Sequence, residues 1–140
     1  MNVPNLRSPR ETVGGLVHFG RMLDKIRLHA AGKLPADYHA ALGVGFDGRT
    51  IAFLHVAYAD VVAQVKAGAS DEAVLEWCYQ HGRKPTEDEI EIWDAFMSKR
   101  GWRDDGAESL AKRIAEAPDL AGRTDILTSF DFIDADEGRL

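Results

Sequence analysis

The sequence predicts a mostly α-helical fold: a single compact domain, residues 1–140, of five to seven helices around a central N-terminal helix. A length of 140 residues suits one domain with one core. Hydrophobic residues make up 45% of the chain and charged residues 29%, which is the balance of a globular protein and not of a disordered one. Apolar side chains recur at helical spacing in several segments, and the short connections between these segments are typical of a helical domain.

The central helix is expected within residues 8–31. Ser8 is a candidate N-cap, because a proline follows it and a glutamate comes three residues later. The two glycines at 14–15 weaken a helix, so it either bends there or a separate helix begins near residue 16. Residues 16–31 follow the helical period and Gly32 is the expected stop. Apolar residues on both sides of this helix indicate a central position: Leu16, Phe19, Leu23, Ile26 and Ala30 on one face, Val17 and Leu28 on the other.

A long, glycine-rich loop is expected at about 33–49, because these residues follow no clear period. The loop has room for a short strand around residues 42–46. Loops of this length in a compact domain are often functional. Residues 50–56 are apolar on all sides, so we expect them to be buried, but periodicity does not distinguish a helix from a strand there.

Start and stop signals predict the remaining helices. An amphipathic helix ends at Gly68, and the next runs from an N-cap at Ser70 to Gly82. The clearest start is the capping box of Thr86 and Glu89. A short helix ends before Pro118, and a last one is expected over residues 124–135. We expect His81 on a packed face and the following side chains in the core: Phe19, Leu23, Ile26, Trp77, Trp93 and Phe96.

Composition excludes several classes of protein. The net charge of −6 argues against nucleic-acid binding as the main role. No apolar run approaches the length of a membrane span, and the first twenty residues lack the layout of a signal peptide. The single Cys78 cannot form an intrachain disulfide. We therefore expect a cytoplasmic protein with no nucleic-acid or membrane partner, and its oligomeric state is left open.

The charge is unevenly distributed along the chain. Residues 1–70 hold 8 basic and 5 acidic residues (+3), whereas residues 71–140 hold 9 and 18 (−9). The asymmetry indicates either an anion-binding half beside an acidic half or simply more exposed helix surface in the second half. Ion pairs between the acidic residues at 131–137 and basic residues of the first helix would balance the opposite net charges of the two halves.

Several ordered blocks of sequence resemble one known family. These blocks are Leu6–Glu11, Gly14–Gly15, Arg21–Arg27, Ala31–Leu34 followed by Tyr38–His39, Ser70–Trp77, Trp93–Gly101 and Asp131–Gly138. Together they span nearly the whole chain and resemble a bacterial family known only as domain of unknown function 5069. The resemblance implies a small, single-domain bacterial protein, and it implies no reaction.

A stripe of basic and imidazole side chains on the central helix is the candidate site. Its members fall within about 80° of one another around the helix, next to the apolar face: His18, Arg21, Lys25 and His29. Two permanent cations beside two imidazoles can bind a carboxylate or a phosphate. The alternative is that Arg21 and Lys25 lay their aliphatic stems over the edge of the core and hold their charges in water.

Three further residues join the candidate site. Asp24 lies three residues from both Arg21 and Arg27, so it can pair with either and orient it. Tyr38 and His39, in the loop after the helix, could close over the same groove. No metal site and no cofactor are expected, because phosphate-loop and zinc-finger spacings are absent and two histidines of one helix lie about 16 Å apart.

Two functions remain open from the sequence. The first is a binding protein or small enzyme for an anionic small molecule, with a pocket between the first helix and the 33–49 loop. The second is a non-catalytic adaptor or regulatory module that presents an acidic helical face to a protein partner. No general base, nucleophile or leaving-group contact can be assigned from these residues, so the question of catalysis stays open.

Overall fold

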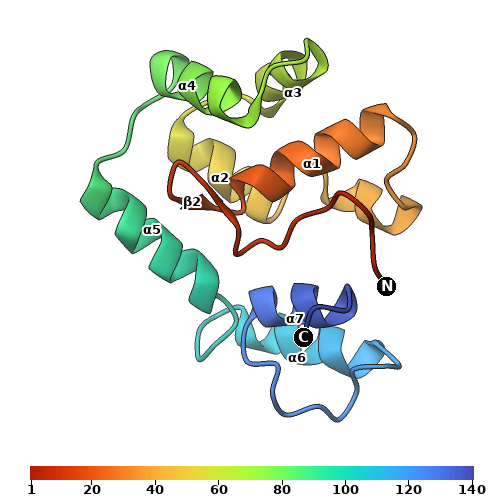
Figure 1. Cartoon of the computed structure of the whole chain (residues 1–140). Coiled ribbons are helices and arrows are strands. Elements are labelled where there is room, and N and C mark those ends of the chain that lie inside the picture. Colours follow the sequence, from red (N-terminus) through yellow and green to blue (C-terminus); the bar gives the residue numbers. More distant parts are fainter.

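The computed structural model describes all 140 residues and confirms a compact, mostly α-helical domain (Figure 1). Helix α1 lies between α3 and α4 on one side and α7 on the other, and α5 runs along one edge from α4 toward α6 (Figure 1). None of the helices combines the length and the apolar character needed to cross a membrane. The elements are β1 Thr12–Val13, β2 Leu16–Val17, α1 Phe19–Ala30, the 3-10 helix η1 Ala36–Ala41, α2 Phe46–Leu54, α3 Tyr58–Lys66, α4 Asp71–His81, α5 Glu87–Lys99, α6 Ala107–Glu116 and α7 Ser129–Asp136.

The expected helix start at Ser8 is wrong, because a β-hairpin precedes the central helix. Strands β1 and β2 pair antiparallel across the turn at Gly14 and Gly15. Both glycines have positive φ, 56° and 84°, which is what a two-residue hairpin turn requires and what a helix cannot accommodate. Helix α1 therefore begins only at Phe19, after His18 in a left-handed conformation.

The expected loop at 33–49 is shorter than predicted. Its middle forms η1, and its last residues begin α2 at Phe46, so the strand considered around residues 42–46 is absent. The apolar stretch at 50–56 continues α2 as a helix as far as Leu54. The carboxylate of Asp47 is fully buried and accepts a hydrogen bond from the backbone of Gly43, and this contact anchors the first turn of α2. The same carboxylate contacts His18 and Lys25, so tertiary contacts hold in place a helix that periodicity does not predict.

The capping signals place the later helices correctly, with one exception. Ser70 caps α4 through a bond from Ala73, and Thr86 and Glu89 form both bonds of a capping box at α5. The last helix begins at Ser129, not at residue 124, because a second capping box between Thr128 and Asp131 starts it there. Residues 124–128 are therefore a connection, although Ile126 within it is buried.

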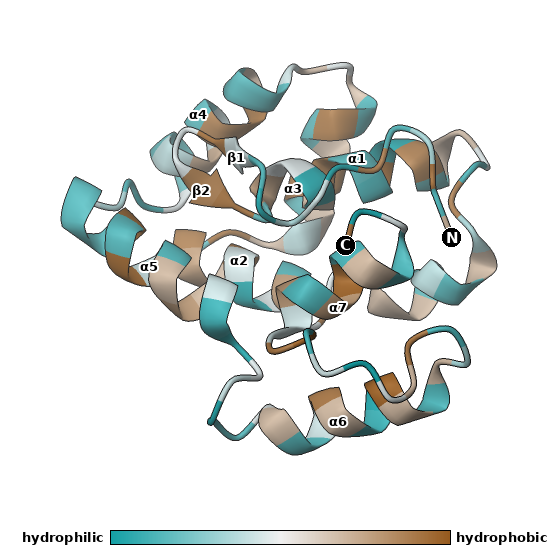
Figure 2. Ribbon diagram, turned by 60° about the horizontal axis from the view of Figure 1, so that its bottom comes forward, coloured by the Kyte–Doolittle hydropathy of each residue, from teal (hydrophilic) through white to brown (hydrophobic).

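Burial matches the prediction in α1 and departs from it in α4 and α5. Phe19, Leu23 and Ile26 are buried, whereas Trp77 and Trp93 are half-buried. The side chain of Phe96 is 42% exposed, and His81 is exposed and stacks on Trp77. Helix α5 packs mainly on β2 at the edge of the molecule, so only part of its apolar face reaches the core. Figure 2 shows the hydrophobic β2 beside an α5 whose N-terminal end is hydrophilic.

The two largest of four apolar clusters lie on either side of the cavity described below. The larger is formed by α1, α2, α3, α4 and the hairpin, with Leu16, Phe19 and Leu23 fully buried at its centre. The smaller packs α6 on α7, and Figure 2 shows these two helices on the opposite side of α2 from α4. It consists of Leu110, Leu120, Ile126, Phe132 and Ala135. The polar residues that link the two clusters surround the candidate site.

Candidate functional site

A cavity of about 500 Å³ lies where α1, the η1–α2 segment, α6 and α7 meet. Its volume is within the range of small-molecule sites, about 300–1,000 Å³. Most of the residues around it are polar or charged. The charged and aromatic residues among them are His18, Arg21, Lys25, Asp37, Tyr38, Phe46, Arg49, Arg100, Arg113, Phe132, Asp136 and Glu137.

At the inner end of the cavity, Asp47 binds two side chains of the central helix. Its Oδ1 lies 2.7 Å from His18 Nε2, and its Oδ2 lies 2.9 Å from Lys25 Nζ. The backbone N–H of Gly43 donates to Oδ2 as well, at 3.1 Å. All three side chains are buried, so the charges of Asp47 and Lys25 balance each other away from water.

Burial and this pairing shift the pKa values of the group. Burial lowers the pKa of His18 below its ordinary value, although the bond to Asp47 opposes this. Burial also lowers the pKa of Lys25, and Asp47 again opposes it. Burial by itself would raise the pKa of Asp47, but the hydrogen bond to His18 and the charge of Lys25 outweigh this effect. The pKa of Asp47 is therefore lowered. A carboxylate, an ammonium and a neutral imidazole are the consistent charge states at neutral pH.

A second buried pair joins α1 to the C-terminal end of α7. Arg21 donates to both oxygens of Glu137, at 2.8 and 2.7 Å, a bidentate arrangement that fixes the orientation of both groups. The hydroxyl of Tyr38 donates to the same carboxylate at 2.8 Å, and Arg139 pairs with it from outside. Burial by itself would raise the pKa of Glu137, but these donors hold the pKa below its ordinary value.

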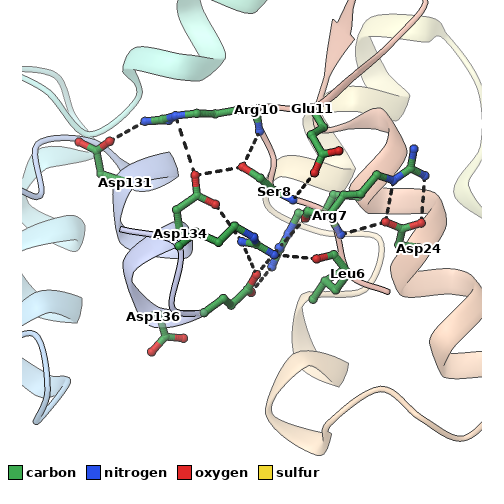
Figure 3. A network of polar contacts seen from close by, with 12 residues as sticks. Leu6, Arg7, Ser8, Arg10, Glu11, Asp24, Asp131, Asp134 and Asp136 are labelled. Atoms are coloured by element: carbon green, nitrogen blue, oxygen red, sulfur yellow. Dashed lines mark hydrogen bonds and ion pairs between the residues drawn. The ribbon is translucent and has the colours of Figure 1, made fainter. Parts of the chain in front are cut away.

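The N-terminal segment reinforces the link between α1 and α7 (Figure 3). Arg7 binds Asp24 of α1, and Ser8 donates to Asp134 of α7 at 3.0 Å. Arg10 pairs with Asp131 at 2.5 Å, as Figure 3 shows. Acidic residues of the second half therefore pair with basic residues of the first half, as the charge asymmetry predicts, and the partners include the N-terminal segment as well as α1.

Four of the seven residues predicted for the site line the cavity, and three do not. His18, Arg21, Lys25 and Tyr38 line it. His29 and His39 contact each other edge to face, with ring centroids 4.8 Å apart, and both are exposed outside the cavity. Asp24 pairs with Arg7 and Arg27 and does not contact Arg21. A helical wheel places His29 and His18 on the same side of the helix. It does not show that the two residues lie about 16 Å apart along the helix axis.

The sequence did not identify five residues of the site. Asp47 is the one acidic residue of α2, and its apolar surroundings are the signal that could have revealed a buried, paired carboxylate. Glu137 was identified only as part of an acidic segment. Three arginines come together from separate parts of the chain and carry no local signal: Arg49, Arg100 and Arg113.

The side chains of two of these arginines form no ion pair and no hydrogen bond within the protein. The guanidinium of Arg49 lies over the ring of Phe96 at 5.4 Å, and that of Arg113 lies over Phe132 at 4.4 Å. Arg100, in contrast, pairs with Asp104 and Asp105. Unpaired guanidinium groups held on aromatic rings keep their donors available for a carboxylate or phosphate.

The lining contains five basic residues and three acidic ones, although the protein carries a net charge of −6. Three of the basic residues are paired: Arg21 with Glu137, Lys25 with Asp47, and Arg100 with Asp104 and Asp105. Arg49 and Arg113 remain without an ion pair. The acidic residues Asp37 and Asp136 are exposed, and water screens their charges. No group of three or more His, Cys, Asp or Glu side chains is placed to hold a metal ion. The chemistry that these side chains offer is binding of an anion and hydrogen bonding to it.

Comparison with known proteins identifies the family. No curated protein matches the sequence. The model of one family, described as Domain of unknown function (DUF5069), matches residues 3–139, which is almost the entire chain. This agrees with the resemblance of the ordered sequence blocks, and the chain belongs to the DUF5069 family.

Proposed function

We propose that this protein binds a small anionic molecule, a carboxylate or a phosphate, in the cavity between α1, the η1–α2 segment, α6 and α7. The observation that carries the proposal is a pair of arginines in the cavity lining, Arg49 and Arg113, whose guanidinium groups lie on aromatic rings and have no carboxylate partner. An anion that leaves water must recover its hydrogen bonds, and converging guanidinium groups supply them in planar pairs.

The buried cations have a different role in this proposal. Arg21 and Lys25 are already neutralised by Glu137 and Asp47, so they shape the inner wall and orient its polar atoms. Arg49 and Arg113 approach from α2 and α6, and their charges are free to meet the ligand. The ligand therefore lies against α1 and the η1–α2 segment on one side and against α6 and α7, with Phe132 of the smaller apolar cluster, on the other.

This binding role is compatible with a small enzyme whose substrate is an anion of the same class. We also propose that the protein is bacterial, as the family resemblance implies, and that it acts in the cytoplasm, as expected from the sequence. Its one cysteine, Cys78, is buried in the larger apolar cluster, and burial raises the pKa of its thiol to about 11. This residue therefore serves packing and does not require an oxidising compartment.

Titration calorimetry with inorganic phosphate, propyl phosphate and propionate tests the binding proposal. Arg49→Gln and Arg113→Gln should each weaken binding about tenfold, the usual effect of losing one charge-assisted hydrogen bond. Both variants should keep their stability, because neither arginine forms an ion pair in the protein. The matched control is Arg103→Gln, since Arg103 also lies over an aromatic ring, Trp102, but outside the cavity. Equal affinity in all four proteins, or no binding of any anion, would contradict the proposal.

The adaptor alternative has less support. Many carboxylates of the acidic second half are occupied by internal arginines, including Asp71, Asp134 and Glu137. The exposed acidic residues that remain cluster on α4 and the start of α5, among them Glu72, Glu76, Glu87 and Asp88. A pull-down with the wild-type chain and with a Glu87→Lys, Asp88→Lys variant tests this alternative. Loss of a captured protein in the variant would favour the adaptor.

A further inference from the structure

His18 carries two unfavourable features that folding alone does not explain. Its Nδ1 is buried and has no hydrogen-bond partner in the protein, which is unfavourable for a polar group. Its backbone has φ 67°, a left-handed conformation that is strained for a residue with a Cβ. Features of this kind persist where the surroundings enforce them, and they concentrate at functional sites.

The surroundings of His18 determine which ring nitrogen holds the proton. Asp47 is a carboxylate with three neighbours and has no proton to donate. The 2.7 Å contact therefore requires His18 Nε2 to donate to Asp47 Oδ1. Because Lys25 already balances the charge of Asp47, the imidazole stays neutral, and its Nδ1 is left as a bare acceptor.

The imidazole of His18 lies at the cavity wall. It lines the cavity together with Lys25 and Tyr38, and Phe46 packs against it with ring centroids 5.6 Å apart. Asp47 on one edge and Phe46 beside the ring prevent it from turning. Nδ1 itself is buried in the ligand-free protein, so a ligand hydroxyl reaches it when the atoms that cover it move aside.

We propose that His18 Nδ1 accepts a hydrogen bond from a hydroxyl group of the bound ligand, so the ligand is a hydroxylated anion, such as a hydroxy acid or a phosphorylated polyol. This inference rests on the proposed function, because it takes the anion as bound by the arginines of the same cavity. The arginines recognise the charged end of the ligand, and His18 selects for the hydroxyl. An analogue without the hydroxyl leaves Nδ1 unpaired and gains nothing from it.

Matched pairs of ligands test the inference by calorimetry. Glycerol 3-phosphate is compared with propyl phosphate, and lactate with propionate. In the wild-type protein the hydroxylated member of the pair that fits should bind about tenfold more tightly or better. The phosphate pair and the carboxylate pair distinguish the two sources of negative charge. Equal affinities within both pairs would overturn this inference alone, whereas failure of all four anions to bind would overturn the proposed function as well.

A glycine variant separates the role of the ring from that of the backbone. His18→Gly keeps the left-handed conformation without strain and leaves the Asp47–Lys25 pair in place. The measured quantity is the ratio of the two affinities within each ligand pair, and in His18→Gly the preference for the hydroxylated member should disappear. The control is His55→Gly, because His55 also has positive φ, 58°, but is exposed and outside the cavity. A hydroxyl preference that survives in His18→Gly would overturn the inference.

Nitrogen NMR of the wild-type protein tests the same point without any variant. In the ligand-free protein the ring of His18 should be neutral, with the proton on Nε2 and none on Nδ1. Glycerol 3-phosphate or lactate should shift the Nδ1 signal, whereas propyl phosphate or propionate should leave it nearly unchanged. A proton on Nδ1 in the ligand-free protein would overturn the inference.

Discussion

At the scale of single residues, the buried charges depend on one another more than on solvent. Asp47 has no exposed surface, and its ionised state is held by His18, Lys25 and the backbone of Gly43. Removing one member of such a group leaves the others desolvated without a partner, and this cost exceeds the net contribution of the pair. Residues that hold the cavity in shape are therefore also residues that hold the fold together.

Asp47→Asn is accordingly expected to lower the free energy of unfolding by about 3–5 kcal/mol, because Lys25 becomes a buried charge without a counter-charge. Urea denaturation measures the loss. Asp60→Asn is the control, since Asp60 is exposed and unpaired, and its effect should stay within about 0.5 kcal/mol. The double variant Asp47→Asn, Lys25→Met should recover part of the loss. A double variant less stable than Asp47→Asn would argue against the pairing.

At the scale of elements, the hairpin decides where the central helix begins. The turn at Gly14 and Gly15 reverses the chain, and β2 then delivers His18 to the start of α1. A helix that continued through residues 14–15 would carry His18 around the helix and away from Asp47. The position of the imidazole in the cavity thus depends on the conformational freedom of two glycines.

Gly15→Ala should destabilise the protein by about 1–2 kcal/mol, the cost of a left-handed conformation for a residue with a Cβ. Steric conflict adds little, because the nearest atom to a Cβ here, Ile90 Cγ2, would be 3.5 Å away. Gly15→Asn should cost less, since asparagine tolerates this conformation better than alanine. Thermal and urea denaturation compare the two variants. If Ala proved as stable as Gly, the turn geometry described above would be wrong.

At the scale of the whole molecule, ion pairs between the two halves of the chain hold the cavity together. The basic residues of α1 and the N-terminal segment meet the acidic residues at the C-terminal end of the chain, as Figure 3 shows for Arg10 and Asp131. Phe130 of α7 adds an apolar contact with Val17 of β2 and Met97 of α5. The fold and the site therefore share a dependence on ionised carboxylates.

Acid should weaken the fold for this reason. The folded protein holds the pKa of Asp47 and Glu137 below their ordinary values of 3.8 and 4.5. The stability from these groups is complete above the ordinary values and is lost as the pH falls through the lower, folded values. The pKa of His18 is also lowered from 6.5 in the folded protein. As the pH falls through 6.5, His18 therefore binds a proton in the unfolded chain before it does so in the folded protein. The free energy of unfolding should therefore begin to fall below about pH 6.5 and fall further below about pH 4.5.

Urea denaturation across this pH range measures the effect. The variant Glu137→Gln should have a lower stability at neutral pH and a shallower decline in acid, because it lacks one of the two carboxylates. A constant free energy of unfolding from neutral pH to about pH 4 would show that the carboxylates and His18 titrate alike in the folded and unfolded states.

The sequence by itself determined the features that depend on neighbouring residues. The capping box at Thr86 and Glu89 and the N-cap Ser70 act within one helical turn, so their residues predict α4 and α5 without knowledge of the rest of the chain. The apolar period of the central helix likewise predicted the burial of Phe19, Leu23 and Ile26. The positive stripe of Arg21 and Lys25 indicated the helix that carries the site.

Only the tertiary structure decided which residues share the cavity. Arg49 and Arg113 lie 64 positions apart, and Arg21 binds Glu137 across 116 positions, so no local pattern relates them. Tertiary contacts also override local signals. Ser8 donates to Asp134 and caps no helix, and the contacts of Asp47 with His18 and Lys25 hold the end of a glycine-rich segment in α2. A local helix or turn preference contributes about 1 kcal/mol. Burying a charge without its partner costs about 3–5 kcal/mol. Where a local preference and a buried ion pair compete, the ion pair therefore determines the structure.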